Sequence, residues 1–66
     1  MDFCITHEGT VARVELHSDA AKDFARAEMS VEGWQWLGSD CFAVDHRVAR
    51  WLAEDLRGLD FEVLVQ

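Results

Sequence analysis

The two cysteines and two of the three histidines of this chain are spaced so that they could form a zinc site. Cys4 and His7 are separated by two residues, and Cys41 and His46 by four, which makes a Cys2His2 set on paper. The first pair falls in a predicted strand, and residues three apart on a strand point to opposite faces of the sheet. We therefore expect no metal site, and we interpret these residues as two small thiols, buried or half buried, and two surface imidazoles.

The sequence contains no pattern that favours catalysis. A thiol enzyme would need a cysteine beside one of the three histidines, and no spacing brings such a pair together. No local arrangement selects two carboxylates for acid–base work, and the four glycines are isolated, so there is no phosphate-binding loop. We predict a protein that is not an enzyme, with no catalytic residues and no cofactor.

The remaining candidate chemistry is electrostatic. Residues 27–46 carry four acids and no lysine or arginine, and they contribute −4 to the formal net charge of −7. Uncompensated charge on a small domain opposes compaction, so acids retained there suggest a basic partner. The four acids are Glu28, Glu32, Asp40 and Asp45.

Two of these acids lack a local structural explanation. Asp45 is placed to cap a helix and Asp40 to form a turn. Glu28 and Glu32 are expected four residues apart near a helix C-terminus, where they repel each other and oppose the helix dipole. Stability alone would not favour that arrangement, although the reading of all four as ordinary surface acids stays open.

These residues must be positioned by one small domain that spans residues 1–66, for which we predict an α+β fold. Its predicted elements, in the order ββαββαβ, are a β-hairpin over 2–17, a helix from Ser18 to about Ser30, short strands at 34–37 and 41–44, a helix that Asp45 caps and Gly58 ends, and a strand at 61–65. Two helices packed on one face of a mostly antiparallel sheet would bury the apolar residues. The buried hairpin face is expected to carry Phe3, Ile5, Val14 and Leu16.

Charged pairs and apolar stripes are expected along both helices. On the first helix, Asp19 and Asp23 are expected to pair with Lys22 and Arg26 at a spacing of three residues. The second helix has an apolar stripe at helical spacing, with Trp51 at the edge of the core. The stripe residues are Val48, Ala49, Leu52 and Leu56.

Trp34 and Trp36 share one face of a predicted strand. Either they pack in the core under a helix, or they form an exposed aromatic anchor for a partner. The sequence does not choose between these interpretations.

Composition excludes several classes of function. With a sequence pI near 4.6, direct binding to nucleic acid or anionic lipid is disfavoured, because such contacts depend on lysine and arginine. No apolar stretch is long enough to span a membrane, and the N-terminus lacks a signal-peptide pattern. We expect a cytoplasmic monomer.

In its length, its acidity, its lone α+β domain and its lack of catalytic or targeting motifs, the chain resembles the small acidic anti-CRISPR proteins of phages and mobile elements, with type I-C inhibitors the nearest group. Several of these act as DNA mimics against Cascade-type complexes. The resemblance implies an inhibitor whose partner is a basic nucleic-acid-binding protein such as Cascade.

Mimicry is physically reasonable, because phosphates along a DNA strand lie roughly 6–7 Å apart, as do carboxylates four apart on a helix or two apart on a strand. The expected acidic surface consists of Glu28, Glu32, Asp40, Asp45, Asp19 and Asp23, with Trp34 or Trp36 as an anchor. The alternative is a small protein-interaction module, such as an antitoxin or assembly factor, that uses Trp34, Trp36 and the last strand as an open sheet edge.

Overall fold

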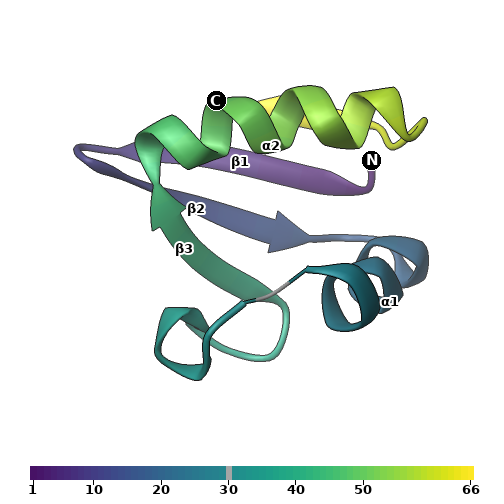
Figure 1. Cartoon of the computed structure of the whole chain (residues 1–66), viewed down its shortest axis with the longest axis horizontal. Helices are drawn as coiled ribbons and strands as arrows, with labels where there is room; N and C mark the ends of the chain where they lie inside the picture. Colours follow the sequence, from purple (N-terminus) through teal and green to yellow (C-terminus); the bar gives the residue numbers. More distant parts are fainter. Residues whose placement is uncertain (30) are drawn as a thin grey trace.

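The structure, a computed structural model, describes residues 1–29 and 31–66, and its α+β class confirms the prediction (Figure 1). The predicted helix end at Ser30 lies outside the described residues. The elements are β1 (Phe3–Glu8), β2 (Val11–Leu16), α1 (Asp19–Glu28), the 3-10 helix η1 (Gly33–Gln35), β3 (Cys41–Asp45), α2 (His46–Gly58) and β4 (Val63–Val65).

The four strands form one mostly antiparallel sheet in the order β3-β2-β1-β4. β2 is antiparallel to both β1 and β3, whereas β4 joins the other side of β1 in parallel. β1 and β2 form the predicted hairpin, whose two-residue turn begins at Gly9 with a φ of +71°. A positive φ at this position suits glycine, which has no Cβ to clash with the backbone.

One face of the sheet forms the core with both helices. The predicted face of the hairpin is confirmed, since Phe3, Ile5, Val14 and Leu16 are all buried. Alanines from both helices, together with Leu56 of α2, join the same cluster. In Figure 1, α2 runs alongside β1 at one side of the sheet, while α1 lies toward the other side. Among the residues that the structure describes, no helix packs on the opposite face of the sheet.

Both predicted helix starts are confirmed by their caps. The Ser18 hydroxyl accepts a hydrogen bond from the backbone N–H of Ala21 (3.0 Å), and the Asp45 carboxylate accepts one from the N–H of Arg47 (2.8 Å). Each bond satisfies a donor that the first helical turn cannot satisfy by itself.

The predicted apolar stripe of α2 is confirmed except at Val48, which is exposed. Ala49 and Leu56 are buried, Leu52 packs half buried against the core, and Ala53 is buried as well. The prediction that Trp51 lies at the core edge is wrong, because its side chain is 65% exposed. Two alanines one turn apart let the helix approach the sheet closely, and this contact fixes which side of α2 faces inward.

The predicted strand at 34–37 is also wrong. Its first residues belong to η1, and only Trp36 forms a bridge, to Phe42. The reason is the Gln35 side chain, which donates to the carbonyl of Ala43 (3.1 Å) and accepts from the N–H of Glu32 (2.9 Å). A side-chain amide thus occupies the edge of β3 where a backbone ladder was expected.

The last strand is shorter than predicted, with β4 covering only Val63–Val65. Phe61 is taken out of the strand because its N–H donates to the carbonyl of Leu56 (3.0 Å) and its ring packs against Phe3 and Phe24. The chain therefore packs against the core at Phe61 before it joins the sheet.

Candidate functional site

The six predicted acids do not form a single array. Asp40 lies just before β3, and Asp45 is the last residue of that strand. At the rise per residue of a β-strand, the two are roughly 16 Å apart. Each also has a cation beside it, since Asp40 lies 3.8 Å from Lys22 Nζ and Asp45 lies 3.3 Å from Arg47 Nε. The Arg47 backbone N–H, together with the guanidinium, lowers the pKa of Asp45 below its usual value. Both carboxylates therefore serve the fold.

The other four predicted acids have no ion pair with any residue that the structure describes. We call this exposed set the α1–η1 acids. They are Asp19, Asp23 and Glu28 on α1, and Glu32, which caps η1. The expected pairs of Asp19 with Lys22 and of Asp23 with Arg26 are not among the ion pairs that the described residues form, because Lys22 pairs with Asp40 instead.

The expected helical spacing of Glu28 and Glu32 is wrong. α1 ends at Glu28, and Met29 is already extended, with φ −98° and ψ 131°. Asp19 and Asp23 do lie four residues apart on one helix, which separates them by about 6 Å along the axis. The phosphate-like spacing therefore occurs at Asp19 and Asp23, which sequence analysis had treated as self-neutralised.

The whole molecule carries more carboxylates than its cations neutralise. Of its thirteen side-chain carboxylates, three lie beside Lys22, Arg47 or the amino group of Met1, and a fourth, that of Glu15, lies 3.8 Å from His17, which is a cation only when protonated. The other nine have no such partner among residues 1–29 and 31–66. This excess of unpaired negative charge is the dominant electrostatic feature of the surface.

The two tryptophans of the predicted anchor have different environments. Trp34 is 82% exposed, while Trp36 is half buried, with its ring centroid 5.4 Å from that of Phe42. On a strand these residues would share a face, but η1 rotates them apart, because a 3-10 helix turns by a third of a circle per residue. Trp36 is therefore a packing residue, and Trp34 alone is available as an anchor.

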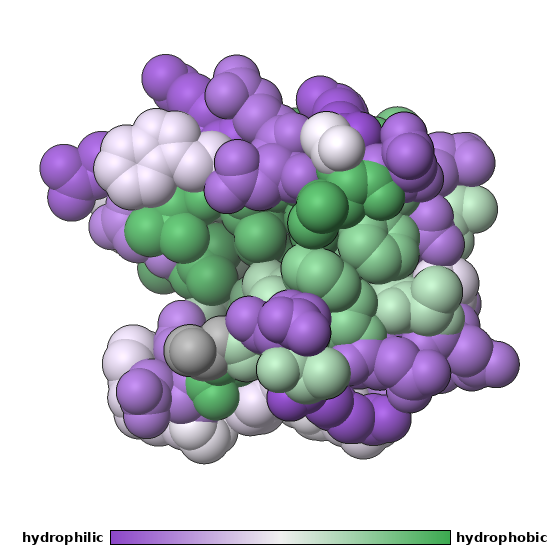
Figure 2. Space-filling model, turned by 45° about the vertical axis from the view of Figure 1, so that its right-hand side comes forward, coloured by the Kyte–Doolittle hydropathy of each residue, from purple (hydrophilic) through white to green (hydrophobic). Residues whose placement is uncertain are grey.

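An apolar groove between α1 and α2 is a feature that sequence analysis missed. It has a volume of about 510 Å³, and Phe24, Met29 and Leu52 are among its lining residues. Figure 2 shows hydrophobic residues gathered in a band between two hydrophilic regions. The lining includes the acids Glu54 and Asp55 and, among the described residues, no lysine or arginine. The sequence signal for it was the excess of apolar residues on and after α2, of which Leu52, Leu56 and Leu59 line the groove.

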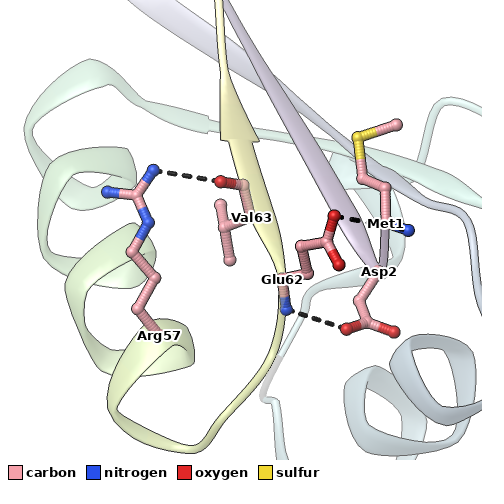
Figure 3. A network of polar contacts seen from close by, with 5 residues as sticks. All are labelled: Met1, Asp2, Arg57, Glu62 and Val63. Carbon is pink, nitrogen blue, oxygen red and sulfur yellow. Dashed lines mark hydrogen bonds and ion pairs between the residues drawn. The ribbon is translucent and has the colours of Figure 1, made fainter.

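The predicted open edge at the last strand is partly closed (Figure 3). Arg57 donates to the carbonyl of Val63 (3.0 Å) on the side of β4 away from β1, whereas the bond from the N–H of Glu62 to the Asp2 carboxylate (2.8 Å) lies on the side that faces β1. The opposite edge of the sheet is covered as well, because the N–H of Leu37 donates to the carbonyl of Cys41 (2.8 Å). Covered edges disfavour the addition of a partner strand.

The two cysteines lie on the sheet face that has no helix. Glu15 is the cross-strand neighbour of Cys4 on one side and of Cys41 on the other, so two strand spacings separate the thiols. That is about 10 Å, which is too far for a disulfide. Burial raises the pKa of the Cys41 thiol, and nearby Arg13 partly offsets this.

Comparisons with known proteins found no matching family model, no matching curated protein and no matching solved structure. Within the part of the chain that the structure describes, neither helix combines the length and the apolar character that a membrane crossing requires. A functional assignment must therefore be argued from the surface itself.

Proposed function

We propose that this protein is a non-enzymatic inhibitor that binds the basic nucleic-acid-binding groove of another protein and excludes nucleic acid from it. The observation that carries the proposal is the set of nine carboxylates without ion-pair partners among the described residues. The α1–η1 acids lie among them and are all exposed.

The spacing of these acids supports mimicry of a phosphate backbone. Asp19 and Asp23 are about 6 Å apart along α1, close to the separation of successive phosphates on one strand. Glu28 extends the acidic residues to the C-terminal end of the same helix. Because the helix is held to the sheet by buried Ala21 and Ala25, its carboxylates are presented by a rigid support.

Binding of this kind is driven by charge. Carboxylates would attract the lysines and arginines of the groove, which speeds association and makes the complex sensitive to salt. Exposed Trp34 would supply apolar contact area beyond the charged residues. A Cascade-type complex of a CRISPR system is the target that the resemblance to anti-CRISPR proteins suggests.

A protein-interaction module is the second candidate, and two observations favour it. Trp34 is exposed, and the apolar groove between α1 and α2 remains open. The covered sheet edges count against strand addition, so such a module would use the groove. Its partner would be an amphipathic segment with apolar residues for the groove and basic residues for Glu54 and Asp55.

The two candidates can be separated by a competition experiment. The immobilised protein is offered an extract of the host cell, and the captured protein is challenged with duplex DNA. Mimicry predicts that the captured protein binds DNA by itself and that DNA releases it. A partner that stays bound through the DNA challenge, and that is lost from a variant with Leu59→Ala in the groove lining, would contradict mimicry and support the module.

Matched variants assign the binding to the α1–η1 acids. Asp23→Lys with Glu28→Lys reverses two of them, and we expect capture to fall by at least about a hundredfold, as for the loss of several close charge pairs. Glu8→Lys with Glu62→Lys changes the net charge equally at two exposed positions outside the α1–η1 acids and outside the groove lining, and should cause a much smaller loss. Equal losses from the two variants would show that no acidic surface is specific.

A further inference from the structure

The helix-free face of the sheet brings together three metal-ligating side chains that the proposed function does not use. Cys4 on β1 and Glu15 on β2 are direct cross-strand partners. His17 follows Glu15 by two residues, and its N–H still donates to the carbonyl of Asp2 (2.8 Å), so the pairing of the two strands continues to this position. Residues two apart on a strand share a face, so all three side chains lie on the same side.

We infer that Cys4, Glu15 and His17 form a binding site for a zinc ion, with a water molecule as the fourth ligand. Their ligand atoms all lie within 4.8 Å of one another, and His17 Nε2 is 3.8 Å from Glu15 Oε1. Thiolate sulfur, imidazole nitrogen and carboxylate oxygen are the three donor types that zinc takes from proteins. Three protein ligands with one open position is a familiar zinc arrangement.

The geometry requires only a small adjustment. Tetrahedral zinc with bonds of about 2.0–2.3 Å holds its ligand atoms roughly 3.3–3.8 Å apart, so the widest gap must close by about 1 Å. The side chains of His17 and Glu15 are 42% and 38% exposed, which leaves their rotamers free to move. Cys4 is only 4% exposed, so it provides the fixed ligand, and an ion from solvent meets the other two first.

The charges also balance. Binding displaces the proton of the Cys4 thiol to solvent, and the thiolate and the Glu15 carboxylate then offset the two positive charges of the ion. His17 binds as the neutral imidazole through a nitrogen lone pair. Arg13 lies two residues from Glu15 on the same face, about 7 Å along the strand, and it is the opposing positive charge there. The ion and its three protein ligands are together neutral.

A zinc ion here would tie β1 to β2 in a domain whose core is small. Chains of this length often gain stability from a bound metal, because one hydrophobic core supplies little. Since the site forms only when the strands are paired, metal binding adds to the stability of the fold. This inference does not depend on the proposed inhibitor function.

Cobalt provides the direct test, because Co²⁺ occupies zinc sites and reports its ligands by absorption. The full chain is freed of metal with a chelator, kept reduced and titrated with CoCl₂. We expect one equivalent to produce a thiolate-to-cobalt charge-transfer band and the visible bands of a four-coordinate ion, and ZnCl₂ to abolish both. Absence of the charge-transfer band would overturn the inference.

Variants identify the ligands. Cys4→Ser should abolish the band, and Glu15→Gln and His17→Ala should each weaken zinc binding by at least about tenfold. Cys41→Ser and His7→Ala are matched controls, since His7 lies on the opposite face beside α2. Both should bind as the wild type does. If Cys41→Ser weakened zinc binding as much as Cys4→Ser, or His7→Ala as much as His17→Ala, the proposed site would be contradicted. If Cys4→Ser fails to fold, zinc binding by the Glu15→Gln and His17→Ala variants decides.

Discussion

Single carboxylates in this acidic protein have opposite roles. Asp2 lies at the start of the chain, yet it is tied to two other parts of it: its side chain accepts from the N–H of Glu62 (2.8 Å), and it is hydrogen-bonded to Ser18. These bonds, that from Ser18 foremost, hold the pKa of Asp2 below its ordinary value of 3.8. Asp2 is thus a structural acid, in contrast to the α1–η1 acids. Sequence analysis did not single it out, because its partners are remote in the sequence.

The role of Asp2 predicts a pH dependence of stability. A carboxyl whose pKa is lowered by folding stabilises the native state at pH values above its unfolded pKa, and this contribution is lost as the pH falls through the folded value. We expect Asp2→Asn to lower the melting temperature at pH 7. The difference from wild type should shrink as the pH falls from 3.8 through the lower pKa of the folded state, below which the native wild-type side chain is neutral too. Thermal unfolding followed by circular dichroism across this range is the measurement, and a difference that stays constant with pH would contradict the assignment.

At the scale of elements, the parts that depend on local sequence were predictable. The hairpin of β1 and β2 and the starts of α1 and α2 follow from alternation and from capping residues that act within three positions. The segment 34–37 was not predictable in this way. Its alternating residues are typical of a strand, but the Gln35 amide bonds to β3 eight residues later and stabilises a 3-10 turn. When a side-chain amide takes the place of backbone hydrogen bonds between strands, the sequence shows no periodic pattern of residues that would reveal it.

The role of Gln35 can be measured by removing its amide. Gln35→Ala loses the bonds to Ala43 and Glu32, and we expect the free energy of unfolding to fall by about 1–2 kcal/mol. Trp34→Ala, at the exposed neighbouring position, should change it by less than about 0.5 kcal/mol. Urea denaturation of the two variants tests this, and an equal or larger effect of Trp34→Ala would show that Trp34 packs against the fold.

At the scale of the whole molecule, the surface features arise from how the elements are placed. Alanines hold α1 and α2 against separate parts of the sheet, and the groove between them stays open. The amount of negative charge could be predicted from composition, but its distribution could not. Asp40 was expected in the acidic surface and is paired with Lys22, whereas Asp19 and Asp23 were expected to be paired and form no ion pair with the residues that the structure describes. Such differences depend on contacts that Lys22 makes across the fold.

The central claim is that unpaired carboxylates bind a basic groove in place of nucleic acid. Its most direct test is the affinity of the captured partner as a function of salt, measured with purified proteins. We expect the logarithm of the association constant to fall steeply and linearly with the logarithm of the salt concentration, and to fall less steeply for the variant with Asp23→Lys and Glu28→Lys. An affinity that is unchanged by salt, or a slope that is equal in the variant, would contradict the claim.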